Sequence, residues 1–423
     1  MISAEQIDTI GARHHSGLGA PPKIKLSKLV LGSVAQQVQG IGTRAENLEV
    51  ATGWRMSESA ISERFQILSS EVFGQIMDVA LKPQADPRRH PEAFYKGMRL
   101  VGIDGVQFPV ANTEAVETQM KKAGSRRGQA AFAHVGLTWV SELAIHHPIA
   151  AVIGERQESE MELAHQVLAK LSADILLLGD RYYGVGKFLV LLMLVCLDKP
   201  VHFLFRARSN LKPRVIRRLA DGSALVEVTA TDGSTREVRE IRGRVLGRDH
   251  RWTKIRLWTN LLDQRRYPAA ELLELYARRW EQEIATDELK NKLHRRHLLK
   301  SQTPHTAAQE LAALIMAQSV LAQVRMTVAG QAKVPTLRVS FAKTRHYMQG
   351  LWLVIENGQG ILSHKQIQGL VSRVLQRIAN RLTPPRRKRS CPRAVRQPVS
   401  KWPRLMKNVS HSGSFLYKVT PIK

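Results

Sequence analysis

The stretch YARRWEQEIATDELK, residues 276–290, decides how the rest of the chain is interpreted. It places Tyr276, Arg279, Glu283 and Lys290 at intervals of three, four and seven residues. An α-helix advances roughly 100° per residue, so relative to Tyr276 the other three fall near roughly 300°, 340° and 320°. A carboxylate flanked by two cations and an aromatic ring on one stripe is suited to binding a metal ion and a phosphate backbone.

The charge of the chain points to a polyanionic partner. The 423 residues include 64 Lys+Arg and 36 Asp+Glu, which gives a formal net charge of +28. An excess of this size favours nucleic acid, and a basic protein of the ribosomal type is the less specific alternative. The apolar fraction of 43% is ordinary for a globular protein, and the length suggests two or three structural units.

The cysteines and the apolar segments indicate a cytoplasmic protein without a membrane segment. Cys196 and Cys391 form no C-x-x-C pair, so neither a zinc module nor a disulfide framework is predicted. The N-terminus lacks an apolar signal core. The most hydrophobic run, residues 188–197, is about half as long as a bilayer-spanning helix, and we interpret it as a buried core helix.

Changes of pattern along the chain predict four regions. The N-terminal part has apolar residues at helical spacing and suits a small DNA-binding module. Strand-like segments follow a proline-rich linker, and a stretch with period-two alternation and DGS turns predicts an antiparallel β insertion. The tail is broken by prolines and is very basic. The regions are a helical region suited to DNA binding (1–85), a core of strands and helices (95–200 and 263–345), a β insertion (201–262) and a basic C-terminal region (346–423).

Three carboxylates are placed as metal ligands would be. The pattern of MRLVGIDGVQFPV predicts a strand that ends near Asp104 and turns at Gly105, and the apolar run ADILLLGD ends at Asp180. Glu283 lies on the helix quoted above. Two divalent cations about 4 Å apart require carboxylates from separate elements, and such a pair promotes in-line phosphoryl transfer. Arg279 and Lys290 would then hold DNA phosphates.

Each of these residues also has a purely structural interpretation. Asp104 precedes glycine, a common turn pair, and Asp180 can pair with Arg181 or cap a turn. Glu283 can belong to a solvated charged face, on which Asp287 is the rival acid. Tyr276 and Trp280 can be plain core residues, as helical aromatics usually are.

Taken together, these segments resemble bacterial DDE transposases of the insertion sequence four family. Residues 276–290 carry all four positions of that family's Tyr-(2)-Arg-(3)-Glu-(6)-Lys signature. GIDGVQF (102–108) resembles its first-aspartate segment, with Val106 where threonine is usual, and LLLGDRYYG (176–184) resembles its second. SESAISERF (57–65) and HFLFRARSN (202–210) are similar to its N-terminal segment and to the stretch before its β insertion.

The resemblance implies an RNase H-like α/β fold, a mixed sheet flanked by helices, with an antiparallel β insertion between Asp180 and Glu283. It implies that Asp104, Asp180 and Glu283 hold Mg²⁺, with Mn²⁺ as a substitute and two ions expected. The implied reaction is cleavage at the ends of an insertion element and joining of the 3′ ends to target DNA. Relatives often proceed through a hairpin and stack a flipped base on a tryptophan of the insertion. Trp252 and Trp258 lie in the corresponding region, and either ring is a candidate.

The partners implied are terminal inverted repeats, target DNA and a second copy of the chain, in a bacterial cytoplasm beside the nucleoid. A metal-dependent nuclease without strand transfer uses the same acids and is the nearest alternative. A non-catalytic DNA-binding relative is the alternative from another class, and it would bind DNA equally well with and without metal.

Overall fold

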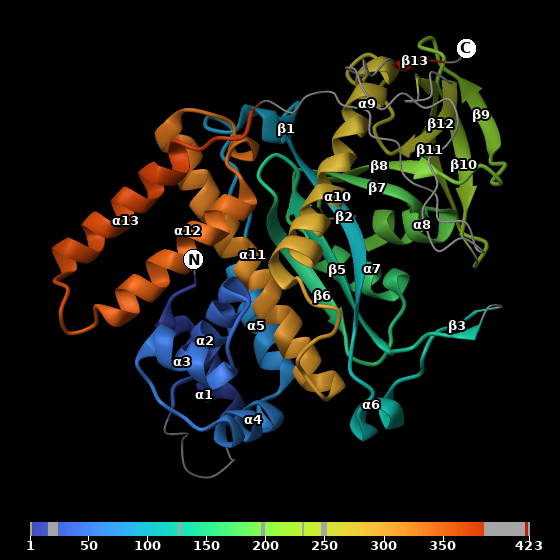
Figure 1. Ribbon diagram of the computed structural model, residues 1–423. Helices are drawn as coiled ribbons and strands as arrows, with labels where there is room; N and C mark the ends of the chain where they lie inside the picture. Colours follow the sequence, from blue (N-terminus) through green and yellow to red (C-terminus); the bar gives the residue numbers. More distant parts are fainter. Residues whose placement is uncertain are drawn as a thin grey trace, which may run out of the picture. The chain divides into compact units, whose positions relative to one another are not determined.

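The structure, a computed structural model, describes residues 2–15, 24–125, 128–195, 199–230, 232–246, 252–384 and 419–421. The chain divides into two compact units. Unit 1 comprises Met1–Ile175 and Trp280–Leu382, and unit 2 comprises Leu176–Arg279 and Thr383–Lys423. Each unit combines strands with helices (Figure 1).

The N-terminal part of unit 1 is helical, as its periodicity predicts. Thr43 caps one helix through a capping box with Glu46, and Ser57 caps the next by accepting from the amide of Ala60. The helices are α1 (Ala4–His15), α2 (Leu26–Gln39), α3 (Arg44–Thr52), α4 (Glu58–Ile67) and α5 (Ser70–Ala80).

Three long strands of unit 1 run antiparallel in the order β6-β5-β2. They are β2 (Met98–Pro109), β5 (His134–Glu142) and β6 (His147–Gly154), and the shorter elements nearby are η1 (Pro91–Ala93), β1 (Phe94–Tyr95), α6 (Glu114–Gln119), β3 (Gly124–Ser125) and β4 (Gly128–Gln129).

The prediction that the first strand ends near Asp104 and turns at Gly105 is wrong. β2 stays paired with β5 from Val101 to Pro109, and Asp104 lies in the middle of the strand opposite Trp139. The glycine serves packing instead of a turn, because a Cβ at Gly105 would lie only 2.3 Å from the carboxyl carbon of Glu160.

The two faces of this sheet are covered by different helices. Gly105 meets α7 (Glu160–Ala169), whereas its neighbour Asp104 meets α10 (Trp280–Asp287) through Thr286. Because successive strand residues point to opposite faces, α7 and α10 lie on opposite sides of β2.

α11 (Pro304–Ala332) is the central core helix of unit 1. It packs against β6 and the N-terminal helices, and Leu311, Leu314 and Ile315 join one hydrophobic cluster with Phe65 and Phe73. In the described part of the chain it alone is long and apolar enough to span a membrane, but 72% of that apolar window is buried inside the protein. The turn η4 (Thr336–Arg338) and the helices α12 (Phe341–Asn357) and α13 (His364–Ala379) follow, and α12 and α13 form a hairpin (Figure 1).

Unit 2 contains the predicted antiparallel insertion. Its strand order is β7-β8-β12-β11-β10-β9, and β13 pairs with β11. Both DGS turns are present, with Gly222 and Gly233 at φ of 83° and 84°, values that favour glycine. The elements are β7 (Ile175–Gly184), α8 (Gly186–Val195), β8 (Val201–Ala207), β9 (Arg214–Arg218), β10 (Ala224–Thr229), β11 (Thr235–Leu246), β12 (Trp252–Thr259), β13 (Val419–Pro421) and α9 (Ala269–Tyr276).

Two further predictions need correction here. β7 does not end at Asp180, because it continues through two tyrosines to Gly184, where the lack of a side chain lets the backbone of Arg206 approach. The segment 276–290 is helical throughout but is not one regular α-helix. α9 ends at Tyr276, a 3₁₀ turn (Ala277–Arg279) leads into α10, and a π-helix (Glu288–His294) follows.

Candidate active site

Asp104 and the helix that carries Glu283 come together in unit 1. The hydroxyl of Thr286 donates to Oδ2 of Asp104 at 2.9 Å, and the amide of Gly105 donates to Oδ1 at 3.1 Å. Thr286 lies three residues after Glu283 on α10, so both residues share the helix face that is turned to β2. The first and third predicted acids therefore lie within about one helical turn of each other, and both are half-buried.

Lys290 lies at the same edge of β2. Its ammonium donates to the carbonyl oxygen of Gln107 at 3.0 Å and lies 5.8 Å from the ring centre of Phe108. Burial lowers the pKa of His134, and the charge of Lys290 lowers it further. A half-buried cation thus lies beside the strand of Asp104.

Asp287, the rival acid on this helix, is engaged elsewhere. Its carboxylate accepts from the Asn291 amide at 2.8 Å and forms an ion pair with Lys292 at 3.0 Å. Burial raises the pKa of Asp287, but these two partners outweigh burial and lower it overall. The contacts of Thr286 favour Glu283 over Asp287 as the acid next to Asp104.

Asp180 lies in unit 2, where Tyr276 contacts the strand that carries Asp180 and Arg279 packs against Tyr276. The amide of Tyr182 donates to Oδ1 of Asp180 at 2.7 Å. The Tyr276 hydroxyl donates to the carbonyl oxygen of Gly179 at 3.1 Å, and burial raises the pKa of Tyr276 although Arg279 and Arg206 oppose the rise. Tyr276 is thus a neutral, buried residue that fixes the backbone before Asp180, as the structural interpretation expected.

Arg279 packs beside Tyr276 in unit 2. Its guanidinium lies 5.8 Å from the ring centre of Tyr276, and its side chain is half-buried. The contact is a cation–π pair, which orients the guanidinium while its charge remains partly solvated.

The two tryptophans of the insertion have different surroundings. Trp252 is 44% exposed, and the guanidinium of Arg244 lies 5.4 Å from its ring centre. Trp258 is 2% exposed, and its indole N–H donates to Oε2 of Glu240 at 2.8 Å. A base can therefore stack on Trp252, whereas Trp258 offers no ring face because it fills the core.

Within the described parts of the chain, no three His, Cys, Asp or Glu side chains gather closely enough to hold a metal ion. Asp104 and Glu283 supply two carboxylates in unit 1, and Asp180 belongs to unit 2. Carboxylate oxygens are the donors that Mg²⁺ and Mn²⁺ prefer, so the chemistry of the donor set suits such ions.

Sequence reasoning missed Thr286, which holds Asp104. The available signal was its spacing, because a residue three positions after Glu283 shares its helix face. A threonine on a helix is too common for that spacing alone to identify a functional residue.

Comparison with known proteins identifies the family of the chain. The model of the family described as "Transposase DDE domain" matches residues 95–319, which is more than half of the chain. The transposase InsG for insertion sequence element IS4 from Escherichia coli strain K12 is 24% identical over 373 residues, which are 82% of this chain and 78% of that protein. Among solved structures, the piggyBac transposase synaptic complex with hairpin DNA aligns over 96% of this chain and 84% of that chain, with 8% identity and a TM-score of 0.41.

The fold and the family match define a DDE transposase, an enzyme that cleaves DNA and transfers strands by phosphoryl transfer. The chain belongs to the transposase DDE domain family and is similar to transposases of the insertion sequence four type. The expected α/β architecture, with strands flanked by helices and an antiparallel β insertion, is confirmed. Enzymes of this family use divalent metal ions and act on DNA.

Proposed function

We propose that Asp104, Asp180 and Glu283 are the metal-binding carboxylates of this transposase. The enzyme cuts at the terminal inverted repeats of its element and joins the 3′ ends to target DNA. The observation that carries the proposal is the Thr286–Asp104 hydrogen bond, because it places the helix face of Glu283 against the strand of Asp104.

The residues divide the chemistry between them. Two Mg²⁺ ions, or Mn²⁺ in their place, would activate a water or a 3′-hydroxyl and stabilise the leaving oxygen. Thr286 fixes one carboxylate oxygen of Asp104, and Tyr276 fixes the backbone next to Asp180. Asp104 and Asp180 are thereby oriented before DNA arrives, so the entropic cost of ordering these two carboxylates is reduced.

Cationic and aromatic side chains supply the DNA contacts in this proposal. Arg279 and Lys290 are half-buried cations suited to phosphates, and Trp252 is an exposed ring suited to stacking on a displaced base. The buried Tyr276 contacts the backbone next to Asp180, and the buried Trp258 fills the core of the insertion, so neither ring is proposed to contact DNA.

The proposal also assigns a role to each of the four regions of the chain and to a homodimer. Residues 1–85 bind DNA, 95–200 with 263–345 form the catalytic core, 201–262 form the insertion, and 346–423 add a basic region. The enzyme works as a homodimer on paired ends, in the bacterial cytoplasm beside the nucleoid. The net charge of +28 supports extensive contact with DNA phosphates.

The test uses duplex DNA that carries the sequences flanking the chain's own gene. Wild type, Asp104→Asn, Asp180→Asn and Glu283→Gln are incubated with it in Mg²⁺ or EDTA, together with a labelled target plasmid. We expect metal-dependent cuts at a defined end and joined products from wild type alone, a loss of at least about 1000-fold in the variants, and DNA affinity within about twofold.

The other outcomes identify the alternatives. Cutting without joined products would show a nuclease. Equal binding in Mg²⁺ and EDTA with no cutting by any protein would show a binding relative. Activity retained in Glu283→Gln but lost in Asp287→Asn would assign the third acid to Asp287.

A further inference from the structure

A buried histidine that is not part of the proposed site contacts two carboxylates of the helical segment that carries Glu283. His146 ends the turn between β5 and β6 and is fully buried. Its Nδ1 lies 2.8 Å from Oε2 of Glu288, and its Nε2 lies 3.1 Å from Oε2 of Glu281. Both carboxylates belong to the helical segment that carries Glu283, Glu281 to α10 and Glu288 to the π-helix.

The contacts require a doubly protonated ring. Ionised carboxylates only accept hydrogen bonds, so both ring nitrogens of His146 must donate. Burial lowers the pKa of His146, but Glu288 and Glu281 outweigh burial and raise it overall. Burial likewise raises the pKa of Glu288, but Arg325 and His146 bring it to about 2.

Arg325 of α11 anchors this cluster to the core of unit 1. Its guanidinium donates to Oε2 of Glu288 at 3.1 Å and to the carbonyl oxygen of Val339 at 3.0 Å. Hydrogen bonds between buried charged side chains therefore connect the turn after β5, the helical segment that carries Glu283, and α11. Buried ion pairs of this kind hold a defined geometry, because breaking them leaves an uncompensated charge.

The helix is held on two sides. Glu281 and Glu288 are seven residues apart and share one face, whereas Glu283 is turned by about 200° from Glu281 and faces the other way. On that other face Thr286 bonds to Asp104 of β2. The rotation of α10 about its axis is therefore fixed by opposing contacts.

We infer that His146 is a positioning residue that, through Glu281 and Glu288, fixes the rotation of α10 and so aims Glu283 at the strand of Asp104. The inference rests on the proposed role of Glu283. His146 touches neither DNA nor metal in this scheme; it acts only through the helix. No signal in the sequence identifies His146 as a positioning residue, because two successive histidines in a strand-like stretch are usually core residues with ordinary hydrogen-bond partners.

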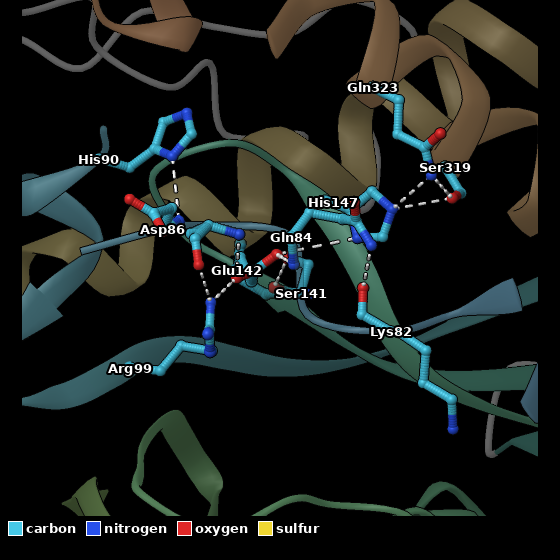
Figure 2. A network of polar contacts seen from close by, with 12 residues as sticks. Lys82, Gln84, Asp86, His90, Arg99, Ser141, Glu142, His147, Ser319 and Gln323 are labelled. Atoms are coloured by element: carbon cyan, nitrogen blue, oxygen red, sulfur yellow. Dashed lines mark hydrogen bonds and ion pairs between the residues drawn. The ribbon is translucent and has the colours of Figure 1, made fainter. Parts of the chain in front are cut away.

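The test compares His146→Asn with His147→Gln. Asn tolerates the φ of 54° at position 146 but is too short to reach two carboxylates. His147 is the matched control, because it is equally buried and its ring contacts Ser319, Gln323 and Glu142, none of them on α10 (Figure 2). Hydrogen exchange of residues 280–294, thermal stability, DNA affinity and the single-turnover cutting rate at saturating DNA are measured for both.

We expect a local effect from His146→Asn. Amides of residues 280–294 exchange at least about tenfold faster, and the cutting rate falls about 10- to 100-fold while DNA affinity stays within about twofold. His147→Gln lowers thermal stability but leaves exchange in that segment and the cutting rate unchanged. If instead both variants lose activity in proportion to stability, or exchange rises evenly over unit 1, His146 has a merely structural role and the inference is overturned.

Glu281→Gln keeps the inference testable if His146→Asn fails to fold. Glu281 is 23% exposed, and the amide oxygen of a glutamine can still accept from Nε2 of the buried His146, so we expect smaller changes of the same kind, about threefold. Glu283→Gln in the same assay separates the two proposals. If it still cuts, the proposed function and this inference both fail; if it is inactive while His146→Asn and Glu281→Gln match wild type in exchange and rate, only this inference fails.

Discussion

His147, at the residue scale, is a buried imidazole that stays neutral where an exposed one would become charged. Burial lowers its pKa from 6.5 to about 3. Its ring lies 2.8 Å from the Ser319 hydroxyl and 3.8 Å from a carboxylate oxygen of Glu142, which also binds Arg99 (Figure 2). Burial raises the pKa of Glu142, although Arg99 and the amides of Gln84 and Ala85 act in the opposite direction.

This makes the stability of unit 1 sensitive to mild acid. Below pH 6.5 the unfolded chain binds a proton at His147 and the folded chain does not, so this contribution is present above 6.5 and is lost as pH falls toward about 3. Between these two pH values, the free energy of unfolding falls with decreasing pH by a slope that approaches about 1.4 kcal/mol per pH unit. Urea unfolding at pH 7.5, 6.5 and 5.5 should show wild type losing more stability than His147→Gln over the same interval; parallel losses would mean that His147 does not titrate differently on folding.

The sequence identified the acids better than the residues that hold them. Asp104, Asp180 and Glu283 are recognisable because they interrupt apolar strands or occupy a spaced helix stripe. Thr286, Glu288 and Arg325 act through contacts between residues far apart in the sequence, and no local pattern encodes such contacts. The burial of Trp258 is likewise not predictable from the sequence, since alternation marks a strand but does not tell which face packs in the core.

At the scale of the element, the helix of residues 276–290 shows what periodicity predicts and what it misses. Its helical character and the shared face of Glu283, Thr286 and Lys290 follow from spacing. The 3₁₀ turn before α10 and the π-helix after it do not. The π-helix begins at Glu288, whose carboxylate is bound by residues of two other elements, so tertiary contacts accompany the departure from regular helix.

The β11–β12 ribbon carries two tryptophans with opposite expected roles. Trp252→Ala removes an exposed ring, so stability should change by less than about 0.5 kcal/mol while DNA binding weakens by about 1–3 kcal/mol. Trp258→Phe leaves the buried Glu240 carboxylate without the indole donor, so it should cost about 1–3 kcal/mol of stability and leave DNA affinity unchanged. Thermal melts and fluorescence polarisation with end DNA measure both; the reverse pattern would make Trp258 the stacking residue.

At the scale of the whole molecule, the positive charge is unevenly distributed along the chain. No acidic residue follows Glu356, and the run Arg386, Arg387, Lys388 and Arg389 lies outside the described residues. Runs of cationic residues bind phosphates without regard to base sequence and release counterions from DNA. The excess in the C-terminal region is therefore expected to supply affinity, whereas the carboxylates of the core supply chemistry.

That division predicts the salt dependence of DNA binding. Replacing residues 386–389 by serine should lower the slope of log Kd against log salt by up to about 3.6, or about 0.9 for each phosphate that the variant no longer neutralises. Cutting at saturating DNA should stay unchanged, because those residues lie outside the proposed site. The matched control replaces the three arginines by lysine, which keeps the charge and should keep the slope. A slope equal to wild type in the serine variant would remove this run from the DNA-binding surface, and a slope lowered equally in the lysine variant would mean that guanidinium geometry, and not charge, binds the phosphates.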